Sequence, residues 1–207
     1  MTEKINERED RLKKLAELKK IGLNPYPAKA EKKNSINEIL MNFEKLLKDG
    51  SELKLAGRLR SRRGHGNLTF AHIEDSSGKI QLAFSKKELP ENSYKIFSKY
   101  IDIGDFLEAA GAAFLTHNGE KSLKVKSWKL LTKTLRPLPD KWHGLADEEE
   151  KFRKRYLDIL FNPEVKEIFI KRAKFWQSIR DFLNQKGFLE VETPVLENTT
   201  GGGEARP

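Results

Sequence analysis

The chain has 207 residues, 37% hydrophobic and 34% charged, which is enough for one large domain or for a small domain with part of another. It has no cysteine, which excludes disulfides and cysteine-based zinc sites. It has neither an apolar run of membrane-spanning length nor an apolar signal segment at its start, so we expect a cytoplasmic protein with no membrane partner. The formal net charge of +9 favours a polyanionic partner, although a basic surface without such a partner explains the charge equally well.

The first 52 residues predict a helical extension. A charged amphipathic helix is expected over residues 3–21, and Gly22 ends it. A second helix is expected from Ser35, because Ser35 and Glu38 have the spacing of a capping box, and it ends at Asp49-Gly50. The apolar faces comprise Leu12, Leu15, Leu18 and Ile21 in the first helix, and Ile39, Leu40, Phe43, Leu46 and Leu47 in the second.

Residues 53–133 predict a small β-barrel. From Leu53 onward apolar residues alternate with polar ones, as they do in strands, and a short helix is expected at 93–100. Five strands with a helix between the third and the fourth is the layout of an OB-fold, although a five-stranded barrel of another kind fits the same pattern. The strands are expected at 53–60, 68–73, 79–84, 105–114 and 122–131, with turns at 64–67, 75–78 and 118–119.

A linker and the beginning of a second domain follow the predicted barrel. Residues 134–146 combine two prolines with apolar residues, which indicates a segment docked on the protein. Over 147–207 we expect helices at 147–161 and 163–186, and Pro163 suits the first position of the second helix. The apolar stripe of that helix predicts a core or a subunit interface and comprises Phe169, Ala173, Trp176, Ile179 and Leu183.

The end of the chain predicts a strand and a glycine-rich turn. Glu190 and Glu192 alternate with apolar residues over 188–195, so one face of the strand carries two carboxylates. The pair invites an acid–base interpretation, but an exposed or interfacial strand face is the interpretation we favour. The glycines at 201–203 allow a close approach of the backbone to a ligand, and they fit a flexible tail equally well.

Common catalytic and metal-binding motifs are missing from the sequence. It has no phosphate-binding loop with its lysine and no dinucleotide fingerprint. The histidines, which are His65, His72, His117 and His143, lack the spacing of metal ligands.

Candidate nucleic-acid-binding residues lie on the predicted barrel strands. Phe70 lies in the middle of the second strand with His72 on the same face, and Gln81 lies in the third. OB-folds stack unpaired bases on aromatic rings and hold phosphates with basic groups, so Phe70 is a candidate stacking platform. Gln81 offers a donor and an acceptor to a base edge. The pattern equally permits Phe70 in the barrel core and a solvated arginine face. The arginines concerned are Arg58, Arg60, Arg62 and Arg63.

Taken together, these segments resemble the class II lysyl-tRNA synthetases of bacterial type. The Arg155-Tyr156-Leu157-Asp158 segment is shared with aspartyl and asparaginyl relatives, whereas the linker and the Ala-Arg-Pro ending are typical of the lysine enzymes. The resemblance extends over essentially the whole chain. The other segments that carry it are Leu55-Ala56-Gly57-Arg58 with Arg62-Arg63, Ile80-Gln81-Leu82, the run from Leu131 to Leu145 with the linker Leu135-Arg136-Pro137-Leu138-Pro139-Asp140-Lys141-Trp142-His143-Gly144, and the end from Gly187 to Pro207.

The resemblance implies an α+β protein: N-terminal helices, a five-stranded OB-fold barrel, and then the first helices and the motif 1 strand of an antiparallel α/β class II catalytic domain. It implies that the barrel binds the uridine-rich anticodon of lysine tRNA, with Phe70 stacked on a base and polar contacts from Arg63, Gln81 and Glu120. It also implies a homodimer through motif 1, and it puts the backbone of Gly201 in the lysine pocket.

The same resemblance implies a lysine–tRNA ligase that uses ATP and Mg²⁺, whose binding residues we expect beyond Pro207. We therefore expect this chain to end within or just after motif 1, to carry no catalytic or metal-binding residue of the ligase, and to be inactive by itself. Two alternatives stay open. The motif 1 segment argues against a stand-alone OB-fold RNA-binding module, and the linker sequence argues against an aspartyl- or asparaginyl-tRNA synthetase relative.

Overall fold

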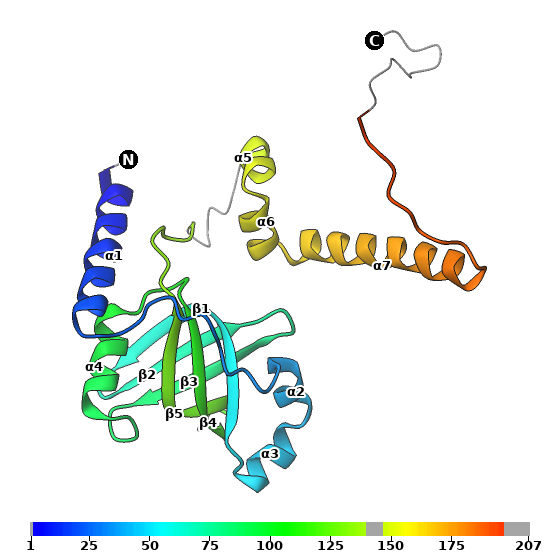
Figure 1. Cartoon of the computed structure of the whole chain (residues 1–207). Coiled ribbons are helices and arrows are strands. Elements are labelled where there is room, and N and C mark those ends of the chain that lie inside the picture. The colour runs from blue at the N-terminus through cyan, green and yellow to red at the C-terminus, as the bar shows by residue number, and fades with distance from the viewer. Residues whose placement is uncertain (1, 140–146, 197–207) are drawn as a thin grey trace. The chain divides into compact units, whose positions relative to one another are not determined.

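The computed structural model describes residues 2–139 and 147–196 of the chain (Figure 1). The chain divides into two compact units, Met1–Leu138 and Pro139–Pro207. The first unit holds the N-terminal helices and the barrel, and the second holds the later helices.

Helix α1 (Thr2–Lys20) confirms the first predicted helix, and it ends as predicted at Gly22. Gly22 has a φ of 78°, in the left-handed region, and its N–H donates to the carbonyl of Lys19. Leu18 is fully buried. Ile21, which was predicted in the same apolar stripe, is 48% exposed, because it lies beyond the last residue of the helix.

The second predicted helix is interrupted and forms α2 (Ile36–Met41) and α3 (Phe43–Asp49), which meet at Asn42. Asn42 has a φ of −101° and a ψ of 17°, which breaks the helical path of the backbone. The predicted capping box is confirmed: the Glu38 N–H donates to the Ser35 hydroxyl, and the Ser35 N–H donates to the Glu38 carboxylate at 2.8 Å.

The predicted five-stranded barrel is confirmed as a closed sheet with the strand order β1-β2-β3-β5-β4 (Figure 1). β3 and β5 pair in parallel, and the other neighbours pair antiparallel. Helix α4 (Glu91–Tyr100) lies between β3 and β4 in the chain, as predicted. The strands are β1 (Leu53–His65), β2 (Leu68–Glu74), β3 (Lys79–Ser85), β4 (Phe106–Leu115) and β5 (Lys121–Thr132).

The first strand is longer than predicted. β1 continues to His65 instead of ending at Arg60, and the connection to β2 shrinks to Gly66 and Asn67. Gly66 adopts a φ of 59°, which suits a tight hairpin. The alternation of apolar residues stops after Arg60, but β2 still offers a pairing partner to every later residue of β1, up to His65 opposite Leu68. Pairing therefore extends the strand beyond its sequence signal.

The barrel core combines side chains of the strands and of α4. Phe84 of β3 and Phe97 of α4 stack with their ring centroids 3.8 Å apart, and Trp128 of β5 meets Phe97 edge-on. Gly111 of β4 approaches β5 so closely that a Cβ atom there would lie 1.9 Å from the carbonyl oxygen of Lys124. The register between β4 and β5 shifts at this position, and only glycine permits so close an approach.

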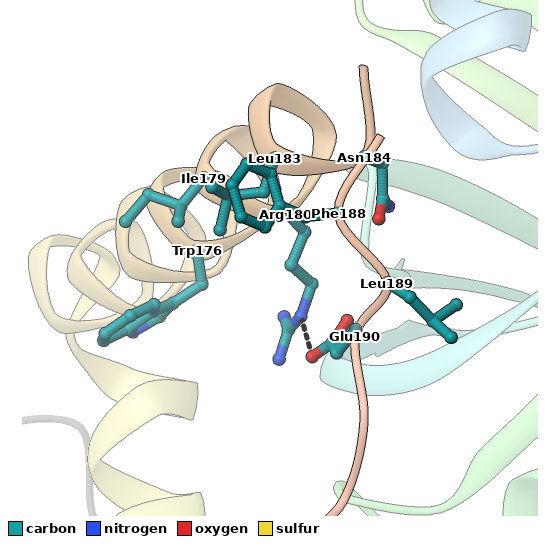
Figure 2. A pocket seen from close by; sticks show the side chains of 8 residues that line it. All are labelled: Trp176, Ile179, Arg180, Leu183, Asn184, Phe188, Leu189 and Glu190. Atoms are coloured by element: carbon teal, nitrogen blue, oxygen red, sulfur yellow. Dashed lines mark hydrogen bonds and ion pairs between the residues drawn. The ribbon is translucent and has the colours of Figure 1, made fainter. Parts of the chain in front are cut away.

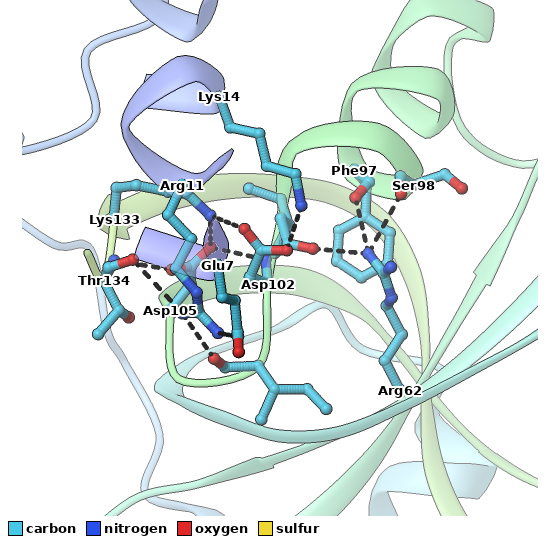
Figure 3. Close-up of polar contacts among 12 residues, drawn as sticks. Glu7, Arg11, Lys14, Arg62, Phe97, Ser98, Asp102, Asp105, Lys133 and Thr134 are labelled. Atoms are coloured by element: carbon cyan, nitrogen blue, oxygen red, sulfur yellow. Dashed lines mark hydrogen bonds and ion pairs between the residues drawn. The ribbon is translucent and has the colours of Figure 1, made fainter. Parts of the chain in front are cut away.

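A buried ionic cluster joins α1 to the loop before β4 and to the end of β5 (Figure 3). Lys133 is 1% exposed, and its ammonium lies 2.6 Å from the Asp102 carboxylate and 2.7 Å from that of Asp105. Lys14 of α1 pairs with Asp102 at 2.5 Å, and Arg11 donates to a backbone carbonyl of the same loop at 3.1 Å. Burial by itself would raise the pKa of Asp102, but hydrogen bonds from Lys133 and Lys14 outweigh it and hold that pKa below its usual value.

Asp75 joins the β2–β3 hairpin to the start of α2. Its Oδ1 accepts from the N–H groups of Ser77 and Gly78 at 2.8 and 3.0 Å. Its Oδ2 accepts from the Ile36 N–H at 3.2 Å and pairs with Lys32 at 2.7 Å. Burial by itself would raise the pKa of Asp75, but the bonds from Lys32, Ser77 and Ile36 hold it well below its usual value.

We expect Asp75→Ala to lower the free energy of unfolding by about 1–3 kcal/mol at pH 7, because backbone N–H groups lose a charged acceptor. Since the folded-state pKa is depressed, this stabilisation is present above the unfolded-state pKa of about 4 and is lost progressively as the pH falls below it. Urea unfolding at pH 7 and at about pH 2.5 measures the effect, with the exposed Asp49→Ala as control. A loss of the same size at both pH values would contradict this account.

The described part of the second unit contains α5 (Glu148–Arg153), α6 (Arg155–Phe161) and α7 (Pro163–Gln185). The helix predicted over 147–161 is interrupted at Lys154, which has a φ of −119° and a ψ of 48°. Helix α7 is confirmed, with Pro163 in its first turn as predicted.

The strand predicted over 188–195 is not formed. The chain from Phe188 to Leu196 has no regular secondary structure. A strand needs a neighbouring strand to satisfy its backbone groups, and the described residues of this unit supply none. Figure 2 shows the Arg180 guanidinium of α7 donating to Glu190, at 2.9 Å. Glu190 is thus engaged with a cation of α7.

Candidate nucleic-acid interface

Phe70 lies on the outer face of the barrel. Along β2 the residues are alternately half-buried and buried, and Phe70 belongs to the half-buried series with Leu68, His72 and Glu74. Ala71, its neighbour in the chain, points into the core and is fully buried. The sequence left the core and the surface both open for Phe70, and the structure places it on the outer face, half-buried.

A β-bulge in β1 brings Arg63 to the same face as Phe70. Leu59 pairs with Ile73, but Ser61 pairs with His72, so Arg60 is an extra residue without its own partner position on β2. After the bulge, Arg63 lies directly opposite Phe70. Opposite residues of an antiparallel pair share a face, so Arg63 stands beside the Phe70 ring, and its side chain is exposed.

The other arginines of β1, for which the sequence left a phosphate-holding role and a solvated face both open, have contacts within the protein. Arg62 donates to three carbonyls at the C-terminal end of α4, including that of Ile101 at 2.6 Å (Figure 3). Arg60 pairs with Glu74 at 3.1 Å. The Arg58 guanidinium lies 4.4 Å from the ring centroid of Phe106, and burial lowers its pKa.

Glu120 and Gln81 bond each other directly on this outer face, and further hydrogen bonds extend from both of them. Glu120, in the turn before β5, accepts from Gln81 Nε2 at 2.6 Å on one oxygen and contacts His72 Nε2 at 2.8 Å on the other. The chain continues from His72 Nδ1 to the Ser61 hydroxyl at 2.9 Å, and from Gln81 Oε1 to the Ser122 hydroxyl at 2.9 Å. Arg63, Phe70, Gln81 and Glu120 thus belong to one face of the barrel.

The two polar residues at the centre of this chain differ in accessibility. Gln81 is only 8% exposed, and both its amide nitrogen and its amide oxygen already have protein partners. The Glu120 side chain is 49% exposed. A carboxylate has more acceptor sites than the two bonds it receives here. Of the two, Glu120 is therefore the one with acceptor sites open to solvent, and Gln81 is engaged within the protein.

Sequence patterns pointed to part of this site. His72 was placed on the face of Phe70, but Ser61 and Ser122 were missed, because only the strand register brings them against His72 and Gln81. Gly201, predicted in the lysine pocket, lies outside the described residues. No group of three or more metal-ligating side chains is found within residues 2–139 and 147–196. No helix among those residues is long and apolar enough to cross a membrane.

A second candidate surface is the apolar face of α7, predicted as a core or an interface. Within the second unit this face is open: Trp176 is 49% exposed and Leu183 is 41% exposed. Figure 2 shows a pocket lined by this helix and the extended segment that follows it, which contributes Phe188 and Leu189. The described part of the unit thus leaves a large apolar stripe uncovered.

Two protein-family models match the chain. Residues 53–131 match the OB-fold nucleic acid binding domain. Residues 147–207 match the class II tRNA synthetases (D, K and N). The first match covers the barrel strands, and the second covers the helices α5 to α7 and the segment beyond them.

Curated relatives are similar over almost the whole chain. A lysine–tRNA ligase of Carboxydothermus hydrogenoformans is 50% identical over 197 residues, which are 95% of this chain and 40% of that protein. A lysine–tRNA ligase of Clostridium perfringens is 46% identical over 207 residues, 99% of this chain and 41% of that protein. One of Oceanobacillus iheyensis is 43% identical and covers all of this chain and 43% of that protein. The chain spans about two fifths of the length of these relatives.

Proposed function

From the premise that this chain belongs to the lysyl-tRNA synthetases, as a portion with the anticodon OB domain and the first part of the class II catalytic domain, we propose that its barrel binds the anticodon of lysine tRNA. One observation carries the proposal. Phe70, Arg63 and Glu120 are accessible on a single outer face of the barrel, with Gln81 behind Glu120.

Each of these groups has a distinct role in the proposal. The Phe70 ring stacks on an anticodon base, and Arg63 supplies a cation for the adjoining phosphate. The Glu120 carboxylate accepts a hydrogen bond from a base N–H. Uridine offers such a donor at N3, whereas N3 of cytidine is an acceptor and the donor of cytidine is the exocyclic amino group at N4. A carboxylate placed against N3 therefore prefers uridine, which supports an anticodon rich in uridine.

Binding of short RNA hairpins to the 207-residue chain tests this function. We expect an anticodon stem-loop with three uridines to bind more tightly than one with three cytidines, with affinity falling steeply as salt rises. Arg63→Gln is expected to weaken both complexes and to reduce the slope of log affinity against log salt by about 1. The exposed Lys48→Gln of α3 serves as control. Equal affinity for the two stem-loops would refute the proposed selectivity.

We propose further that the whole protein activates lysine with ATP and Mg²⁺ and transfers it to lysine tRNA. No step of activation is assigned to the described residues of this chain, among which no group of three or more metal-ligating side chains is found. Gly201 is proposed to contribute its backbone to the lysine pocket. The open apolar face of α7, with Trp176 and Leu183, supports a homodimer through motif 1.

By itself, the 207-residue chain is proposed to be inactive as a ligase. It spans about 40% of the relatives that carry the ligase name. We expect no lysine-dependent exchange of pyrophosphate into ATP in a purified sample. An exchange rate that follows the concentration of the pure chain, and that needs lysine, would show that the residues present are sufficient.

A further inference from the structure

We infer that His72, held by Ser61, is a positioning residue that fixes the Glu120 carboxylate for RNA. The inference rests on the proposed function, because it assigns the support of a group that the proposed function uses. Its basis is the hydrogen-bonded chain across β1, β2 and the β4–β5 turn, which joins residues far apart in the sequence.

Glu120 needs such support because of its place in the fold. It lies at the end of the β4–β5 turn, and its side chain is half exposed. A glutamate in this position is free to adopt many rotamers unless neighbours hold it. Here one carboxylate oxygen is bound by His72 and the other by Gln81, which face each other across the β2–β3 ladder. The carboxylate is thus oriented before any ligand arrives.

The chemistry of the groups determines the direction of each hydrogen bond. A carboxylate only accepts, so the hydrogen between His72 and Glu120 lies on Nε2 of the ring. In the neutral ring Nδ1 is then an acceptor, and the Ser61 hydroxyl donates to it at 2.9 Å. Glu120 thereby selects the tautomer, and the Ser61 hydroxyl, which can donate or accept, holds the other ring nitrogen in place. The bulge at Arg60 is what places Ser61 opposite His72.

A preoriented carboxylate loses less conformational freedom when RNA binds. Removing the His72 tether should therefore weaken binding of the uridine stem-loop by about 2- to 10-fold, which corresponds to one side chain that must be ordered on binding. The preference for uridine over cytidine should fall by a similar factor. In contrast, RNA contacts made by Phe70 and Arg63 do not depend on this tether.

The test is a double-mutant cycle on the 207-residue chain with the uridine and cytidine stem-loops. His72→Phe keeps a planar ring but removes the N–H, and His72→Gln restores a donor. We expect His72→Phe to weaken uridine binding 2- to 10-fold in the parent chain and to have no effect in a Glu120→Ala background. We expect His72→Gln to recover most of the loss. Ser61→Ala should also weaken uridine binding, by a smaller factor than His72→Phe, and this loss too should be absent in the Glu120→Ala background.

The outcomes separate the inference from the proposed function. If His72→Phe and Ser61→Ala weaken binding as much without Glu120 as with it, the two residues act by another route and the inference is wrong. The inference also fails if neither variant has an effect while Glu120→Ala does. If Glu120→Ala itself leaves both affinities unchanged, the role proposed for Glu120 fails first. Thermal unfolding of each variant identifies any that has lost the fold, and if His72→Phe is among them, the Glu120-dependent loss expected for Ser61→Ala carries the test.

Discussion

Replacing Lys133 with methionine is expected to lower the free energy of unfolding by about 3–5 kcal/mol. The Lys133 side chain is fully buried, and its ammonium is the cation between the carboxylates of Asp102 and Asp105. Methionine has a similar shape but no charge, so the two carboxylates would lose the cation they share. Asp102 would keep its ion pair with Lys14, whereas Asp105 would keep the backbone N–H groups of Asp102 and Thr134. Urea unfolding at pH 7 measures the loss.

Two comparisons show whether charge is the cause. Lys126→Met, an exposed change on β5, the strand that Lys133 follows, is expected to alter the free energy of unfolding by no more than about 0.5 kcal/mol. Adding Asp105→Asn to Lys133→Met should recover part of the loss, because one of the uncompensated charges is removed. A Lys133→Met protein as stable as the parent would mean that the cluster contributes nothing to folding.

Acid should weaken the same cluster. Hydrogen bonds from Lys133 and Lys14 hold the pKa of Asp102 below its usual value, although burial alone would raise it. A depressed folded-state pKa stabilises the fold above the unfolded-state value of about 4, and this stabilisation is lost as the pH falls below it. The difference in unfolding free energy between the parent and Lys133→Met is therefore expected to shrink in acid.

Phe70→Ala is expected to weaken binding of the uridine stem-loop by about 5- to 150-fold, which corresponds to the stacking of one base on an aromatic ring. Because the ring lies half-buried on the outer face, we expect the free energy of unfolding to fall by no more than about 1 kcal/mol. Fluorescence anisotropy with a labelled stem-loop measures the affinity, and urea unfolding measures the stability.

A matched control is Phe106→Ala. Phe106 is also a half-buried aromatic residue of the barrel. It lies opposite Arg58 of β1 and contacts that guanidinium, whereas Phe70 lies opposite Arg63, further along the same strand. We expect it to leave RNA affinity nearly unchanged. Phe70→Ala binding as tightly as the parent would remove the stacking role, and a lost barrel fold would mean that the ring is needed for packing instead.

Local signals predicted much of the fold. The capping box at Ser35 and Glu38, the end of α1 at Gly22 and the strands of the barrel depend on residues close together in the chain. The interruptions at Asn42 and Lys154 were missed, because neither residue is a strong helix breaker. The strand at 188–195 was predicted from its alternation, but alternation does not supply the neighbouring strand that pairing requires.

In the candidate site, too, some features depend on residues close together in the chain and others on pairing between strands. By itself, the sequence determined that β2 carries an aromatic ring in its middle and that β1 is rich in arginine. The family resemblance implied Arg63, but the residue pattern did not distinguish it from the other arginines, and only the tertiary structure supplied the reason why it stands beside that ring. Plain alternation from Arg58 and Arg60 would put Arg62 on the outer face, but the bulge at Arg60 reverses the order, so Arg62 turns toward α4 and Arg63 toward Phe70. The side chains of a strand alternate from face to face, so one extra residue exchanges the faces of all that follow, and only pairing with the neighbouring strand reveals it.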